Sequence, residues 1–94
     1  MHKKDYLNVA DILKNRRLEE GLTLRELEEY SDVSRSEIST IEDKEELLKL
    51  KKALVAARDC YNLVKTFGDD ELKEKIMNLT LKLKTHMKKE LINQ

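Results

Sequence analysis

Apolar residues recur every three or four positions along most of the chain, a spacing that places them on one face of an α-helix. No segment alternates apolar and polar residues between turn signals, as a half-buried β-strand would. The first helix is expected from Asn8, a capping residue, to about Glu20, where Gly21 favours a left-handed end. The pattern therefore predicts an all-α protein. The inward face of this first helix is expected to hold Val9, Ile12, Leu13 and, as a further candidate, Leu18.

Residues 23–42 are expected to form two short helices joined by a tight turn. Thr23 can cap the first helix, and Glu26 three positions later can complete a capping box. Ser31 and Asp32 are expected to stop this helix, because short polar side chains compete for backbone hydrogen bonds. The apolar face of the helix is expected to consist of Leu24, Leu27 and Tyr30.

The second short helix of this pair is expected to begin after Ser34, with Glu37 at the reciprocal capping position. Two helices joined by so short a turn must cross steeply, which is the geometry of a helix-turn-helix. The residues expected to pack back on the first helix are Val33, Ile38 and Ile41.

Residues 44–67 contain no helix breaker, so one continuous helix is expected there. Its apolar residues alternate between three and four positions apart, which is the repeat of a coiled-coil seam. The expected seam consists of Leu47, Leu50, Leu54, Ala57, Tyr61 and Val64.

A final helix is expected from about Glu71 to Ile92, after an interruption at Gly68 and a cap at Asp69 or Asp70. So short a link folds residues 44–94 into an antiparallel helical hairpin. The apolar stripe of the last helix exceeds what one facing helix needs, so we expect it to form a homodimer interface. This stripe comprises Leu72, Ile76, Leu79, Leu83, Met87 and Leu91.

The composition agrees with a small helical protein. The chain has 94 residues, no proline, two glycines and 40% charged residues. Its one cysteine, Cys60, excludes an intramolecular disulfide, fits a reducing cytoplasm and is interpreted as a small core residue. We expect no signal peptide and no membrane span, because no apolar run approaches the length that a bilayer requires.

The sequence contains no pattern that indicates catalysis. A glycine-rich phosphate loop, a Cys/His metal set and a nucleophile–base constellation are all missing from it. The carboxylates alternate with lysines on amphipathic segments, as they do on solvated faces. We therefore expect neither an enzyme nor a bound metal or cofactor.

The segment GLTLRELEEYSDVSRSEISTIE resembles the helix-turn-helix of XRE-type regulators, the family of phage Cro proteins and repressors. The resemblance covers residues 12–43 and implies a lambda-repressor-like DNA-binding domain over residues 1–67, with the motif at 23–42 and the helix 44–67 shared with the hairpin. In that family the second motif helix lies in the major groove of DNA. By position, the resemblance places Arg35, Ser36 and Thr40 at base edges with Ser39 nearby, places Arg17, Thr23 and Asp43 near the phosphate backbone, and adds Ser34, Glu37 and Lys44 to the DNA-binding set.

Three positions depart from the pattern of the family. Glu28 stands where a small residue is usual, so the helices would cross more widely or Glu28 would tilt outward. Asp32 stands where glycine is usual, although aspartate can adopt the required turn conformation. Lys44 replaces the glycine that often ends the second motif helix, so that helix is expected to run on.

The charge is distributed unevenly although the net charge of the chain is zero. Residues 1–43 hold seven Lys/Arg and eleven Asp/Glu, and residues 44–94 hold twelve and eight. An acidic DNA-binding half is unexpected, because phosphate neutralisation supplies much of the affinity for DNA. Arg16 is compatible with a phosphate contact or with pairing to Glu19 or Glu20.

Two functions follow from these observations. The first is a cytoplasmic regulator, similar to phage repressors, that binds double-stranded operator DNA as a dimer. It would occupy two half-sites near a promoter and block or redirect polymerase, most simply as a repressor. The second is a protein-interaction module that keeps the same scaffold but binds another regulatory protein, as an antirepressor would. Glu37 fits either function, because it can face a protein or accept a hydrogen bond from cytosine.

Overall fold

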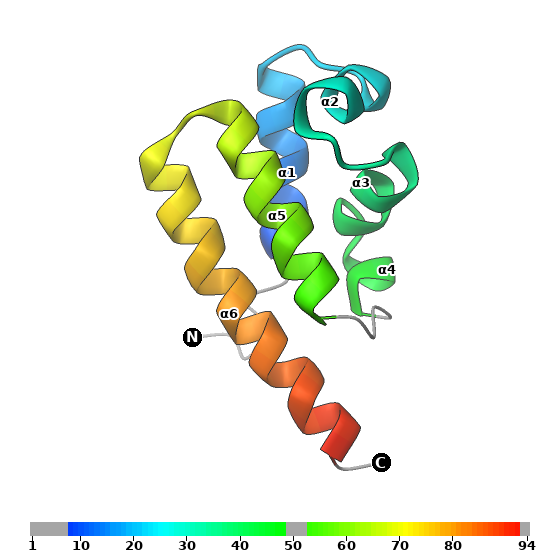
Figure 1. Cartoon of the computed structure of the whole chain (residues 1–94), viewed down its shortest axis with the longest axis vertical. Helices are drawn as coiled ribbons and strands as arrows, with labels where there is room; N and C mark the ends of the chain where they lie inside the picture. The colour runs from blue at the N-terminus through cyan, green and yellow to red at the C-terminus, as the bar shows by residue number, and fades with distance from the viewer. Residues whose placement is uncertain (1–7, 49–52, 93–94) are drawn as a thin grey trace.

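The computed structural model describes residues 8–48 and 53–92, which form six α-helices and no β-strand (Figure 1). The all-α class expected from the apolar spacing is therefore confirmed for this part of the chain. None of these helices combines the length and the apolar character that crossing a lipid bilayer requires. The helices are α1 (Asn8–Glu19), α2 (Leu24–Ser31), α3 (Arg35–Ile41), α4 (Lys44–Leu48), α5 (Ala53–Phe67) and α6 (Asp70–Ile92).

The two longest helices, α5 and α6, lie side by side and run antiparallel, as the hairpin prediction requires (Figure 1). The chain reverses at Gly68, whose φ of 66° lies in the left-handed region that glycine adopts without strain. Asp69 then caps α6, because its Oδ1 accepts the backbone N–H of Leu72 at 3.1 Å. The C-terminal end of α6 extends past the other helices (Figure 1).

One hydrophobic core receives side chains from all six described helices. The hairpin and the N-terminal helices therefore share a core. Cys60 is fully buried in it, as expected, and burial raises the pKa of its thiol to about 12. The buried members are Val9, Ala10, Leu13, Leu27, Val33, Ile38, Ile41, Leu47, Cys60, Leu63, Val64, Ile76 and Leu83.

The helix expected over residues 44–67 comprises two elements in the structure, α4 and α5, and residues 49–52 between them lie outside the described part. The helix α3 ends at Ile41, and Asp43 starts a new helix because its Oδ1 accepts the N–H groups of Glu45 and Glu46 at 2.9 and 3.3 Å. The short α4 packs on α1 and α3, whereas α5 packs on α2, α3 and α6. The second motif helix does not run on at Lys44 as expected, because α3 ends at Ile41 and Asp43 caps α4.

The seam expected along residues 44–67 is correct only in part. Tyr61 is 38% exposed, and Ala57 is only half-buried. Two seam residues, Leu47 and Val64, are buried as expected, and on α5 the structure buries Ala56, Cys60 and Leu63 beside Val64, because α5 must face α2, α3 and α6 together. Of the expected seam residues, Leu50 and the side chain of Leu54 lie outside the described part.

Two expected core residues lie at the surface. Leu18 is 55% exposed and Tyr30 is 65% exposed. In each case a polar neighbour is buried instead, namely Arg17 and Ser31. The side chains of Arg17 and Ser31 both find hydrogen-bond partners inside the fold. Each can therefore be buried in place of the adjacent apolar residue.

The apolar stripe of α6 faces the interior of the chain over its described part. Ile76 and Leu83 are buried in the core, and Leu72 and Leu79 pack against it. These four side chains therefore leave no exposed stripe for a second copy. The side chains of Met87 and Leu91 lie outside the described part.

Arg16 connects the end of α1 to the turn between α5 and α6. Its Nε donates to Glu20 at 2.9 Å, and its Nη1 donates to Asp69 at 2.8 Å. The guanidinium carbon also lies 5.7 Å from the ring centre of Phe67. Arg16 therefore forms an ion pair with Glu20, one of the two roles expected for it, rather than standing free for a phosphate. Asp69 is an additional partner that the local sequence could not indicate.

Candidate nucleic-acid interface

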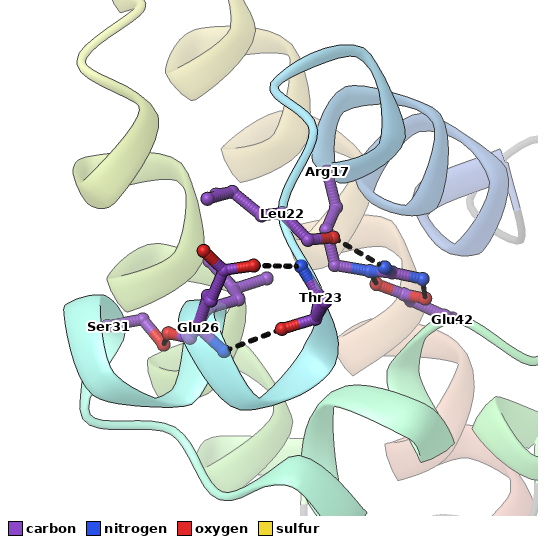
Figure 2. Close-up of polar contacts among 7 residues, drawn as sticks. Arg17, Leu22, Thr23, Glu26, Ser31 and Glu42 are labelled. Atoms are coloured by element: carbon purple, nitrogen blue, oxygen red, sulfur yellow. Dashed lines mark hydrogen bonds and ion pairs between the residues drawn. The ribbon is translucent and has the colours of Figure 1, made fainter.

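The start of α2 is fixed by the capping box expected from the sequence (Figure 2). The backbone N–H of Glu26 donates to Thr23 Oγ1 at 3.1 Å, and the N–H of Thr23 donates to Glu26 Oε1 at 3.0 Å. The donated backbone N–H lowers the pKa of Glu26, and the contact with the Thr23 hydroxyl adds to that effect. Thr23 is exposed, so it remains accessible beside a helix N-terminus.

The connection between α2 and α3 is held by two polar residues. Asp32 has a φ of 63°, so aspartate does take the left-handed conformation for which the family usually has glycine. The buried hydroxyl of Ser31 donates to the carbonyl of Leu27 at 2.6 Å and accepts the N–H of Val33 at 3.2 Å. These bonds close the turn and direct Val33 into the core.

The first turn of α3 has two acceptors for its free N–H groups. Ser34 Oγ accepts the N–H of Glu37 at 3.2 Å, as expected for a cap. The reciprocal bond expected from the Glu37 carboxylate is not formed, since the cap of α3 consists of the Ser34 hydroxyl alone, and the Glu37 side chain interacts with Asp59 of α5 and with the Ser34 side chain. The second acceptor is Glu28 of α2, whose Oε2 accepts the N–H of Arg35 at 2.8 Å.

Glu28 also contacts the side chain of Arg35. Its Oε1 lies 3.4 Å from the Nε of the guanidinium, and the two side chains are 36% and 59% exposed. The side chain of Glu28 therefore points outward, which is one of the two expectations for this residue. Glu28 thereby links the surface of α2 to the first residue of α3.

The outer side of α3 consists mainly of hydroxyl groups and one guanidinium. Arg35, Ser36 and Ser39 are exposed, and Thr40 is half-buried with its hydroxyl donated to the carbonyl of Ser36 at 2.9 Å. The opposite side buries Ile38 and Ile41. The structure therefore brings together on α3 the three residues that the resemblance assigns to base edges and Ser39, which it places nearby.

Arg17 lies inside the fold rather than at this surface (Figure 2). Its Nε and Nη2 donate to the two carboxylate oxygens of Glu42 at 2.8 and 2.9 Å, and its Nη1 donates to the carbonyl of Leu22 at 2.8 Å. The side chains of Arg17 and Glu42 are 11% and 7% exposed. Since Glu42 directly follows α3, this pair fixes the end of α3 to α1.

Asp43, between α3 and α4, and Lys44, the first residue of α4, lie at the edge of an open groove of about 650 Å³ that Ser39 also lines. Asp43 is occupied in capping α4, and Lys44 Nζ lies 2.7 Å from Asp11 Oδ2. Both side chains of that ion pair are about half exposed. These residues therefore remain at the surface near α3, although each already has a partner within the chain.

The middle of α3 contacts α5 through two carboxyl groups. Asp59 is 4% exposed, and burial together with the neighbouring Glu37 raises its pKa to about 6. The hydrogen bond from the Asp59 side chain lowers the pKa of Glu37. Arg58, which is exposed, lies 3.6 Å from Asp59 and partly offsets the negative charge.

Sequence reasoning assigns no role to Asp59 or Arg58 and does not predict the contact between Glu28 and Arg35. Asp59 carries no local signal, because its neighbour Glu37 is distant in the chain. Glu28 did carry a signal, since it is larger and more polar than the family pattern allows at that position. Its contact with Arg35, seven positions later, forms because the turn between α2 and α3 brings the two residues together.

The chain was compared with protein-family models, with curated proteins and with solved structures, and none of the three comparisons found a match.

Proposed function

We propose that this chain is a sequence-specific DNA-binding regulator in which α2 and α3 form a helix-turn-helix and α3 enters the major groove. The observation that carries the proposal is the division of α3 into two sides. One side anchors the helix in the core through Ile38 and Ile41, and the other presents Arg35, Ser36 and Ser39 to solvent. A short helix anchored in this way can be inserted into a groove without unfolding the domain.

The exposed groups on α3 have the chemistry that base recognition requires. An arginine at the first turn can donate two hydrogen bonds to guanine O6 and N7, and serine hydroxyls can donate to or accept from any base edge. Thr23, exposed at the N-terminus of α2, is placed to approach a phosphate. Arg17 is left out of this interface, because its guanidinium is already bonded inside the chain.

The acidic charge around α3 should lower the affinity for DNA, although it does not prevent α3 from fitting the major groove. Glu28, Glu37 and Asp43 lie on or beside α3, so a single copy should bind DNA weakly. Two copies at half-sites about one helical turn apart would add their contacts. We therefore retain a homodimer in the proposal and assign it to the end of α6 that extends past the other helices (Figure 1). Such a dimer would act by occupying a promoter and excluding polymerase.

The direct test is retention on random-sequence duplex DNA over a salt gradient, followed by selection of bound sequences from a random pool. We expect retention that weakens steeply with salt, because phosphate contacts release counterions. Arg35→Ala should abolish enrichment at one base pair per half-site. Lys65→Ala removes one positive charge from an exposed position of α5 and should leave the selected sequence unchanged.

A second candidate is a module that binds another protein through the same surface. The observation that favours it is the exposure of Tyr30, which is 65% exposed beside the acidic Glu29 and Asp32 of α2 and its cap. Exposed tyrosines are enriched where proteins meet. Absence of salt-sensitive DNA retention at low ionic strength would reject the first candidate and favour this one.

A further inference from the structure

Glu28 makes two simultaneous contacts with one residue, the first residue of α3. One carboxylate oxygen accepts the backbone N–H of Arg35 at 2.8 Å, and the other lies 3.4 Å from the Nε of the same residue. The carboxylate therefore determines both where α3 begins and in which direction the Arg35 side chain leaves it.

The backbone contact is not redundant with the cap at Ser34. Ser34 Oγ accepts the N–H of Glu37, whereas Glu28 accepts the N–H of Arg35, so each acceptor satisfies a different free donor of the first turn. A carboxylate beside these N–H groups also interacts favourably with the positive end of the helix dipole.

The side-chain contact leaves the recognition end of Arg35 available. A guanidinium has one N–H on Nε and four on its two terminal nitrogens. Glu28 lies at Nε, and the contacts recorded among the described residues leave both terminal nitrogens of the arginine for a ligand, with its side chain 59% exposed. The two terminal nitrogens are spaced to donate to guanine O6 and N7 together.

We propose that Glu28 is a positioning residue that holds Arg35 in the orientation for guanine and thereby determines the selectivity of α3. This inference rests on the proposed function, because it requires α3 to face base edges. The carboxylate also adds negative charge near the phosphates of any bound sequence, so it lowers the affinity for DNA in general. Glu28 thus lowers the affinity for DNA of any sequence and raises the selectivity for guanine.

The test compares Glu28→Gln with Glu29→Gln. Both substitutions remove one negative charge from α2, and glutamine at position 28 keeps an oxygen that can accept the N–H of Arg35. Glu29 is exposed on the same helix, so it controls for the general charge effect. Thermal melting of both variants should match the wild type and so exclude unfolding as a cause.

The readouts are the Kd for the selected operator, for the operator with the guanine replaced, and for random duplex DNA. We expect both variants to bind random DNA more tightly than wild type. Only Glu28→Gln should reduce discrimination at the guanine, by roughly fivefold or more, which is the lower end of the value of a bidentate contact. In an Arg35→Ala background, Glu28→Gln should no longer change discrimination.

Each result decides one question. If wild type binds the operator and both variants keep the same discrimination, Glu28 acts only as a charge and a helix cap, and the inference is rejected while the proposed function stands. If wild type shows no salt-dependent DNA binding, the proposed function is rejected and the inference with it.

Discussion

The two ends of α3 are held by arginine–carboxylate pairs that differ in burial. At its end, Glu42 receives a bidentate contact from Arg17, and the two side chains are 7% and 11% exposed. At its start, Arg35 meets Glu28 at a longer distance, and these side chains are 59% and 36% exposed. The same pair of chemical groups therefore serves different purposes at the two ends.

Burial determines that difference. A buried charge that loses its partner has no solvent to replace it, so the pair at the end of α3 is needed for folding. An exposed pair contributes about 0–1 kcal/mol and can be replaced by water or by a ligand. The contact between Glu37 and the buried Asp59 lies between these extremes, because one of its groups is exposed and the other is not. The start of α3 is consequently the end at which a ligand can compete.

The largest effect is expected from the buried pair. Arg17→Ala should lower the free energy of unfolding by about 3–5 kcal/mol, because it leaves Glu42 charged and buried and removes the donor to the carbonyl of Leu22. Urea denaturation followed by circular dichroism measures this loss. Arg16→Ala is the matched control, since it removes the neighbouring and more exposed arginine of α1. A loss for Arg17→Ala no greater than that of the control would show that burial does not distinguish the two pairs.

The next effect is a pH dependence that arises at the middle of α3. The pKa of Asp59 is raised from 3.8 to about 6, so the folded chain keeps a proton that the unfolded chain releases in this interval. The free energy of unfolding should therefore fall as pH rises from about 4.5 to 6, by about 1–3 kcal/mol, and change little above that. Glu37 has a lowered pKa and acts in the opposite sense below its ordinary value of 4.5. Urea titrations across this range measure the slope.

Asp59→Asn is the control for this pH dependence. The amide cannot ionise, and its NH₂ group can donate to Glu37. The variant should lose most of the slope and should be more stable than wild type at pH 7. A slope that survives in Asp59→Asn would assign the titration to another group.

Local signals predicted the boundaries of the helices better than their orientation. Thr23, Ser34 and Gly68 act where expected, because a cap depends on a few neighbouring residues. Asp43 also carries the signal of a cap, with two glutamates in the following turn. The resemblance instead points to a phosphate contact there and to a helix that runs on at Lys44, so it does not predict the break before α4. Leu18 and Tyr30 were assigned inward because hydrophobicity alone cannot foresee that Arg17 and Ser31 find partners in the interior.

The candidate site shows the same division between local and distant signals. The exposed set on α3 could be expected, because Ile38 and Ile41 fix which side of a short helix faces inward. The contacts that tie α3 to α1, α2 and α5 join Glu42, Glu28 and Glu37 to residues at least seven positions away. Such contacts depend on the packing of whole helices, so one sequence does not specify them.

Thr23→Ala tests the N-terminal cap of α2 and should have an intermediate effect on stability and on DNA binding. Loss of the hydroxyl removes an acceptor from the capping box and should lower the free energy of unfolding by about 1 kcal/mol. It should also weaken operator binding without changing the preferred sequence, because Thr23 is assigned to a phosphate. Thr85→Ala, which removes an exposed hydroxyl from α6, should change neither property appreciably. A change in sequence preference would mean that α2, rather than α3, reads the bases.

Arg35→Ala should have the smallest effect on stability and the largest on sequence preference. The exposed pair with Glu28 is worth little to folding, and the N–H of residue 35 that Glu28 accepts remains after the substitution, so the urea midpoint should stay close to that of wild type. On DNA, however, the loss of a bidentate donor should remove about 1–3 kcal/mol of discrimination at one base pair of each half-site. Competition titrations with operators changed at single positions measure this loss, and Lys65→Ala controls for the lost charge. Unchanged discrimination in Arg35→Ala would show that the exposed start of α3 does not contact the bases.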